Sequence, residues 1–184
     1  MAIDLSTLTN EANSGDADAQ LQLGEIYESG FGVDRDIKHA IHWYRMAAEA
    51  GSARAQSQLG QLYLRSDGSS AEPREALHWL NLAASQNDIP AQASLAWCYQ
   101  LGTGVKKDLR QAFTWYSKAA KSGHAGARYN LAYMYANGEG VAQNESEALH
   151  WYVRAAEQGH SKAQLNAGLM YARGLGTKQD YNEA

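Results

Sequence analysis

Three histidines recur at one place in the sequence and are the first candidates for metal chemistry. His42, His78 and His150 each stand directly before a tryptophan, and Thr114 takes the remaining place in the series. Imidazole binds zinc at about 2.1 Å, whereas equivalent atoms of packed helices lie about 10 Å apart. Because that spacing is too wide for a shared ion, we interpret these residues as solvated or helix-capping histidines.

Paired glycines and a lone cysteine are the other residues that suggest chemistry. A phosphate-binding glycine loop follows a strand and opens a helix, whereas the Gly-x-Gly pairs of this chain follow helical patterns and read as linkers. Cys98 has no histidine or aspartate placed by sequence to activate its thiol, and a single cysteine forms no internal disulfide. We therefore predict no catalytic, cofactor-binding or metal-binding residue, and no enzymatic activity.

The elements that carry these residues repeat with a period of 36 residues. A fixed period of this length indicates an array of stacked units, each of which packs on its neighbours. The recurring residues are Ala19, Ala55, Ala91, Ala127 and Ala163; Leu23, Leu59, Leu95 and Leu131; Tyr27, Tyr63, Tyr99, Tyr135 and Tyr171; and Trp43, Trp79, Trp115 and Trp151.

Each copy reads as two helices joined by a glycine linker. Short acceptor side chains suit a helix N-cap, and they recur where the second helix should begin: Asp36, Asp108, Asn144 and Asp180, with Glu72 as the weaker equivalent. Residues that tolerate left-handed backbone recur where that helix should end: Gly51, Asn87, Gly123 and Gly159. Ser52 and Asp88 can cap the helix that follows. The pattern predicts an all-α protein of helix pairs.

These boundaries make one continuous array. We predict an N-terminal capping helix in residues 1–18, four copies at 19–54, 55–90, 91–126 and 127–162, and a partial copy at 163–184. The linker at Arg65–Ala71 lacks the paired glycines, so we expect a different loop there. The partial copy has almost no second helix, so either the natural chain continues or a partner or a second copy covers this end.

Packing positions follow from the same period. The four tryptophans share a helix face with the alanine pairs that follow them, and we predict that they form the core. The position after the recurring leucine holds only small residues, which would let two helices approach closely: Gly24, Gly60, Ala96, Ala132 and Gly168.

Composition narrows the class of partner. With 45% hydrophobic and 20% charged residues the chain can bury a core, and its net charge of −4 argues against nucleic acid or an anionic membrane as the main partner. The N-terminus does not resemble a signal peptide, and no run approaches the roughly 18 apolar residues of a membrane span. We expect a cytoplasmic protein, although a trimmed or mature form would look the same.

The repeated pattern resembles the Sel1-like repeat family, which is related to the tetratricopeptide repeats. The resemblance rests on a Leu-Gly-x-x-Tyr first helix, a Gly-x-Gly-Val linker and an Ala-x-x-Trp-Tyr-x-x-Ala-Ala-x-x-Gly second helix, and it covers residues 19–184. The sequence departs from the family pattern at two places. One is the linker at Ser66–Ala71, and the other is Leu80, which stands where other copies have tyrosine. The resemblance implies an α/α right-handed superhelical solenoid of antiparallel helix pairs whose first helices line a concave face.

The resemblance also implies a function. Family members act mainly as adaptors or regulators in protein complexes, often in bacteria, and some are immunity or inhibitory partners. A cysteine-rich branch resembles proteins that bind or hydrolyse β-lactams, but it carries a cysteine pair in each repeat, which this chain lacks. We predict a protein–protein interaction module that binds a protein or peptide on the concave face.

The candidate partner-binding residues stand at positions that vary from copy to copy, between the recurring positions that stay the same. Positions two before and two after the recurring leucine, and others one turn later, should face the groove; Leu21 and Ser57 share the first of these positions. The predicted binding residues are Glu25, Glu28, Gln61, Leu64, Trp97, Gln100, Tyr129, Tyr133, Leu169 and Arg173. Exposed aromatic residues are common interface anchors, although Tyr129 could equally pack sideways on a neighbouring copy.

Two alternatives stay open at this point. One is a hydrolase of the kind suggested by the cysteine-rich relatives. The other is a self-assembling array, in which the last helix pairs with a second chain. The sequence names neither the partner nor the oligomeric state.

Overall fold

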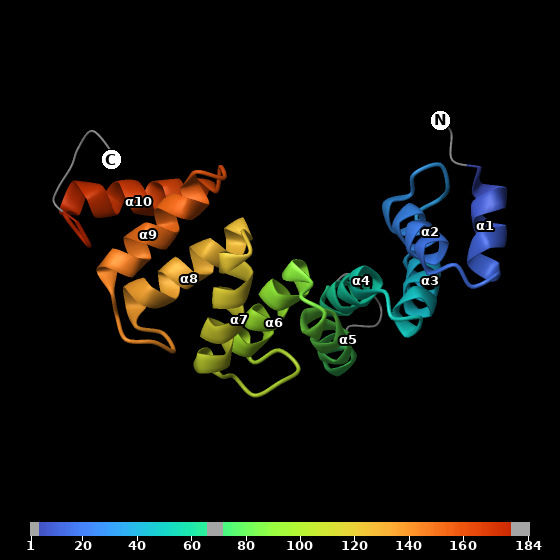
Figure 1. Cartoon of the computed structure of the whole chain (residues 1–184), viewed down its shortest axis with the longest axis horizontal. Helices are drawn as coiled ribbons and strands as arrows, with labels where there is room; N and C mark the ends of the chain where they lie inside the picture. The colour runs from blue at the N-terminus through green and yellow to red at the C-terminus, as the bar shows by residue number, and fades with distance from the viewer. Residues whose placement is uncertain (1–3, 66–71, 178–184) are drawn as a thin grey trace. The chain divides into compact units, whose positions relative to one another are not determined.

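The structure, a computed structural model, describes residues 4–65 and 72–177. Within these ranges every regular element is an α-helix (Figure 1), which confirms the all-α prediction. In chain order the helices are α1 (Leu5–Asn13), α2 (Ala17–Ser29), α3 (Ile37–Glu49), α4 (Ala53–Leu64), α5 (Pro73–Ser85), α6 (Ile89–Leu101), α7 (Leu109–Lys121), α8 (Ala125–Asn137), α9 (Glu145–Ala156) and α10 (Ser161–Arg173). The linker predicted to differ, at Ser66–Ala71, and the predicted cap Asp180 lie outside the described residues.

The chain forms two compact units, Met1–Ala91 and Gln92–Ala184, which we call unit 1 and unit 2. Unit 1 holds α1 to α5, and unit 2 holds most of α6 together with α7 to α10. In unit 1 the successive helices α1 to α5 pack side by side, and in unit 2 the successive helices α7 to α10 do so, as the helix-pair pattern predicts.

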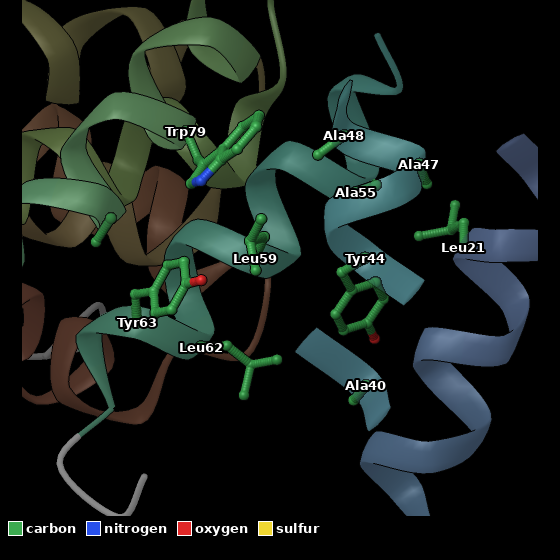
Figure 2. Close-up of a cluster of buried hydrophobic side chains, with 11 residues drawn as sticks. Leu21, Ala40, Tyr44, Ala47, Ala48, Ala55, Leu59, Leu62, Tyr63 and Trp79 are labelled. Carbon is green, nitrogen blue, oxygen red and sulfur yellow. The ribbon is translucent and has the colours of Figure 1, made fainter. Parts of the chain in front are cut away.

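The core of unit 1 has two clusters of buried side chains. Leu23 and Trp43 belong to the first, and Leu59, Tyr44 and Trp79 belong to the second. Figure 2 shows side chains from four successive helices, α2 to α5, meeting in the second cluster. Full burial of a leucine such as Leu59 contributes about 1.5–3 kcal/mol, so the recurring leucines stabilise each copy against its neighbours.

The core of unit 2 includes a cluster built from α8, α9 and α10. Tyr152, Leu149 and Met170 are buried there, and Tyr129 and Trp151 pack at its edge. Burial raises the pKa of the Tyr152 phenol to about 12. The shift follows from desolvation, because removing the phenol from water disfavours its charged form.

The predicted close approach of the paired helices is confirmed in unit 1. A Cβ atom at Gly24 would lie 2.4 Å from the Tyr44 ring, and one at Gly60 would lie 2.7 Å from Leu80 Cγ. Glycine costs about 1 kcal/mol inside a helix relative to alanine. Here that cost is outweighed, because any larger residue would push the two helices apart.

Most of the predicted helix boundaries are confirmed. The side chains of Asp36, Asp108 and Asn144 accept backbone N–H groups at the starts of α3, α7 and α9. Glu72 makes no side-chain capping bond, and Pro73 occupies the first turn of α5, where a missing N–H costs little. All four predicted helix-ending residues, Gly51, Asn87, Gly123 and Gly159, have positive φ.

Of the four tryptophans that we predicted to form the core, only two are buried. Trp43 and Trp79 are each 8% exposed, whereas Trp115 and Trp151 are half-buried. The Lys118 ammonium lies 4.1 Å from the centre of the Trp115 ring, and Trp151 Nε1 donates to Glu147 Oε2 at 3.2 Å. In unit 2 these rings therefore lie at the core boundary, where Lys118 covers one face of Trp115 and Glu147 accepts the indole N–H of Trp151.

Candidate interaction surface

All ten predicted binding residues lie on the first helices of the copies. α2 and α4 carry four of them in unit 1, and α6, α8 and α10 carry six in unit 2. One register position, two residues after the recurring leucine position, holds Glu25, Gln61, Trp97, Tyr133 and Leu169 in successive copies. Its chemistry therefore changes from polar in unit 1 to apolar in unit 2.

In unit 1 the acidic members of this set are already bonded within the fold. Glu25 forms an ion pair with Arg54 at 2.7 Å. Glu28 accepts a hydrogen bond from the Tyr44 hydroxyl at 2.8 Å and is ion-paired with Arg65 of the next copy. These carboxylates hold neighbouring helices together, which reduces what they can offer to a partner.

The two remaining predicted residues of unit 1 also have internal contacts. Gln61 donates to the Ser57 hydroxyl at 3.3 Å, and Leu64 packs half-buried against the second core cluster.

In unit 2 the same face is apolar and open. Trp97 is 41% exposed, Tyr133 39% and Leu169 44%. We call these three residues the apolar stripe, because they occupy the same register position of α6, α8 and α10. Leu101 and Leu165, one turn away on α6 and α10, are more exposed still. Large apolar side chains gathered on one face of a surface are typical of an interaction site.

Two members of the apolar stripe line a cavity. Tyr133 of α8 and Leu169 of α10 border a space of about 340 Å³, together with Arg173. Asn137 and Asn166 add amide groups to its wall, Glu145 adds a carboxylate, and Met170 and Tyr152 add apolar surface. The cavity thus combines an apolar body with a few polar groups, which is the usual composition of a binding pocket.

Tyr129 and Gln100 have internal contacts as well. Tyr129 is half-buried, stacks on the His160 ring at 4.6 Å between centroids, and lies against Tyr152 at 5.7 Å. It therefore packs sideways, which was one of the two interpretations of this residue. Gln100 accepts a hydrogen bond from the buried Tyr116 hydroxyl at 3.0 Å.

The position two residues before the leucine does not face outward in every copy. Leu21 and Ser57 were expected to face the groove, but both are buried, and Leu21 packs in the second core cluster of unit 1. Leu165, in the same register, is exposed in unit 2. This position lies at the border between the core and the open face, so the packing of each copy decides its exposure.

The recurring histidines are solvated, in agreement with the interpretation of the sequence. His42, His78 and His150 are exposed, and each ring packs edge-on against the following tryptophan at 5.0–5.2 Å between centroids. Across residues 4–65 and 72–177 there is no cluster of His, Cys, Asp and Glu that could hold a metal ion. Burial raises the pKa of the Cys98 thiol to about 11, which keeps it protonated at neutral pH and unreactive.

Two other histidines have a role that sequence reasoning missed. His124 Nδ1 accepts the Ala127 N–H at 3.0 Å, and His160 Nδ1 accepts the Ala163 N–H at 3.3 Å. They are the N-caps of α8 and α10. Their positions follow Ser52 and Asp88 in the 36-residue register, which is the signal that could have identified them.

None of the described helices is both long and apolar enough to pass through a lipid bilayer.

Comparison with protein families gives a match along nearly the whole chain. The family described as Sel1 repeat matches at residues 17–52, 53–88, 89–124, 125–160 and 161–184. No curated protein sequence matches the chain.

Solved structures with the same arrangement support the family match. The protective antigen c5321 of uropathogenic Escherichia coli is 32% identical, with a TM-score of 0.84 over 98% of this chain. A Sel1 repeat protein from Oxalobacter formigenes is 33% identical, with a TM-score of 0.84 over 92% of this chain and 67% of its own. Cysteine-rich protein B of Helicobacter pylori is 29% identical, with a TM-score of 0.56 over 73% of this chain and 96% of its own.

The chain spans only 46% of the length of the E. coli antigen. These neighbours confirm the predicted solenoid of helix pairs with a period near 36 residues.

Proposed function

The chain belongs to the Sel1 repeat family, whose members generally mediate protein–protein interactions, and on that premise we propose that the first-helix face of unit 2 binds an apolar segment of a partner protein. The observation that carries this proposal is the exposure of Trp97, Tyr133 and Leu169 at one register position of three successive copies. The equivalent Glu25 of unit 1 is engaged in an ion pair.

The apolar stripe would supply most of the affinity. A few well-packed aromatic residues at the centre of an interface commonly contribute 2 kcal/mol or more each when they are truncated. Trp97 and Tyr133 already have about 60% of their surface covered by the fold, so little side-chain freedom is lost when a partner covers the remainder.

The cavity between α8 and α10 would give selectivity. Its volume of about 340 Å³ suits one or two side chains of a bound segment. Arg173, on the exposed end of α10, borders the cavity together with Glu145, so a neutral polar group of the partner, such as an amide, would be favoured beside its apolar residues. The polar members of the predicted binding set in unit 1, Glu25, Glu28 and Gln61, bond to Arg54, Tyr44, Arg65 and Ser57 and would contribute less to selectivity.

A peptide-display selection against the whole chain tests this proposal. The peptide that it yields is titrated against the wild type and against the double variant Trp97→Ala/Tyr133→Ala by calorimetry. We expect the Kd to rise at least about 30-fold, which corresponds to the loss of one strong anchor. The helical circular dichroism should be unchanged, because both side chains reach the surface.

Leu82→Ala is the matched control. Leu82 is 39% exposed, like Tyr133, but it lies on α5, a second helix of unit 1. This variant should bind the selected peptide with the wild-type Kd. If the double variant also binds as the wild type does, or if Leu82→Ala weakens binding equally, the assigned face is wrong.

A further inference from the structure

A second cavity lies at a different edge of unit 2. It has a volume of about 1010 Å³ and is bordered by two successive glycine linkers, residues 102–108 and 138–144, and by the first turn of α7. Figure 1 shows these linkers, between α6 and α7 and between α8 and α9, along one edge of the unit. None of its lining residues belongs to the apolar stripe.

The frame of this cavity is held by backbone contacts. The Asp108 N–H donates to the Tyr99 carbonyl at 2.9 Å, and the Asn144 N–H donates to the Tyr135 carbonyl at 2.9 Å, so each linker is closed onto its own first helix. Gly140 packs so closely on α7 that a Cβ atom there would lie within 2.2 Å of the Leu109 carbonyl oxygen. Backbone contacts therefore fix the shape of this cavity.

The rim carries three cations. Lys106, Lys107 and Arg110 border the cavity, and all three are exposed. The single carboxylate in its lining belongs to Asp108, whose Oδ1 accepts the backbone N–H groups of Arg110 and Gln111 at 3.0 Å. Across the described part of the chain, no ion pair joins any of these three cations to an acid.

This concentration of positive charge is particular to one copy. The equivalent residues of the first linker are Asp34, Arg35 and Lys38, and those of the fourth copy are Ala142, Gln143 and Ser146. The chain as a whole has a net charge of −4. Like charges this close repel one another, and the positive end of the α7 dipole adds to the local potential. An anionic partner would relieve that repulsion.

We propose that this cavity binds an acidic segment of a partner protein through its aspartate or glutamate carboxylates. Arg110 can accept a carboxylate in a bidentate pair, and the two lysines can neutralise neighbouring charges. Val105, Leu109 and Val141 line the cavity beside the cations and would cover the aliphatic stems of the acidic residues. A nucleic acid needs a longer basic track, and the acidic remainder of this chain would repel it.

Fluorescence anisotropy of a short labelled poly-glutamate peptide with the full chain tests the proposal. The variant Lys106→Gln/Lys107→Gln is compared with Lys121→Gln/Lys162→Gln, which removes the same two charges from exposed positions at the end of α7 and the start of α10. We expect the first variant to raise the Kd about fivefold to tenfold and to flatten its dependence on salt, because two exposed charge pairs are lost. The second should bind like the wild type.

Three outcomes would overturn the proposal. The peptide fails to bind the wild type, both variants weaken binding equally, or a single-stranded oligonucleotide of equal charge binds more tightly than the peptide. Equal weakening would show that net charge, rather than this cavity, attracts the acid. None of these outcomes bears on the apolar stripe, whose test uses different residues and a different peptide.

Discussion

Unit 1 and unit 2 place different chemistry at equivalent positions of the same helix pair. On the first helices of unit 1 the variable positions carry Glu25 and Glu28, which bond to Arg54, Tyr44 and Arg65 inside the fold. On those of unit 2 they carry Trp97, Tyr133 and Leu169, which are about 40% exposed.

The difference shows how one repeat can serve two purposes. A side chain that bonds to the next helix stabilises the array, and the same position becomes available to a partner only when another contact holds the copies together. Both units have such a contact: Gln56 Nε2 donates to the Ala48 carbonyl at 3.0 Å in unit 1, and Arg128 Nε donates to the Ala120 carbonyl at 3.1 Å in unit 2. The two units also differ in how tightly a linker packs on the neighbouring helix and in which residues cap the first helices. Each of these differences can be tested.

The largest expected effect concerns the second glycine of the linkers. Gly32 and Gly140 have nearly equal φ, 77° and 73°, so alanine would suffer the same backbone strain of about 1–2 kcal/mol at either position. A Cβ at Gly32 meets nothing within 4 Å, whereas one at Gly140 would overlap the Leu109 carbonyl. We expect Gly140→Ala to lower the free energy of unfolding by about 3–5 kcal/mol and Gly32→Ala by about 1–2 kcal/mol.

Urea denaturation of both variants measures this difference. Gly32→Ala is the matched control, because it introduces the strain without the overlap. Equal losses would mean that backbone conformation alone requires glycine in these linkers, and that the packing of the fourth linker on α7 contributes nothing.

The next effect concerns the two kinds of variable residue. Glu28→Ala removes the acceptor of the fully buried Tyr44 hydroxyl and should cost about 2 kcal/mol of stability. Leu169→Ala removes a side chain that is nearly half exposed and should cost about 1 kcal/mol. For binding of a peptide selected on the wild type the order should reverse: no change for Glu28→Ala, and about a tenfold weaker Kd for Leu169→Ala.

Thermal melts of the two variants measure the change in stability, and calorimetric titrations measure the change in Kd. A loss of binding in Glu28→Ala while its fold is intact would place unit 1 in the interface. That result would remove the distinction between the units.

Much of the fold was predictable because its signals are local. The caps Asp36, Asp108 and Asn144 and the helix ends at Gly51 and Asn87 depend on residues within one turn, and the period then repeats them. Contacts between copies were harder to predict. Gln56 Nε2 donates to the Ala48 carbonyl at 3.0 Å, and Gln20, Arg128 and Gln164 make the equivalent bond. The recurring glutamine was visible in the sequence. Its hydrogen-bond acceptor is a backbone carbonyl, and the residue types along the chain do not show which carbonyl it is.

The interaction surface was predictable only as a set of candidates. The register identified the face, and the exposure of Trp97, Tyr133 and Leu169 agrees with it. Spacing could not reveal that Glu28 is occupied, because its partners Tyr44 and Arg65 lie 16 and 37 residues away along the chain. The basic cavity was missed for a similar reason, since two linkers 36 residues apart enclose it.

The smallest effect concerns the caps of the first helices. In unit 1 the side chains of Asp16 and Ser52 accept the N–H groups that begin α2 and α4, whereas in unit 2 the ring of His124 accepts the Ala127 N–H. A histidine can accept through Nδ1 only while that nitrogen is unprotonated. α8 should therefore lose its side-chain cap in mild acid, and α2 and α4 should keep theirs.

The sign of the pH dependence follows from the pKa of His124, which burial lowers in the folded state. The unfolded chain then takes up its proton first, near the ordinary histidine pKa of about 6.5. The cap contributes fully above that pH, and its contribution falls as the pH drops through the lower pKa of the folded state. A capping bond is worth about 1 kcal/mol, so the loss should approach that value.

The variant His124→Ser isolates this contribution, because serine caps a helix at every pH in this range. Subtracting its unfolding free energies from those of the wild type between about pH 7.5 and pH 5 removes every other titrating group, including the second capping histidine, His160. The difference should turn against the wild type by about 1 kcal/mol as the pH falls. A difference that stays constant would show that the His124 imidazole keeps its acceptor nitrogen free in acid, and the cap of α8 would then be as insensitive to pH as the caps of α2 and α4.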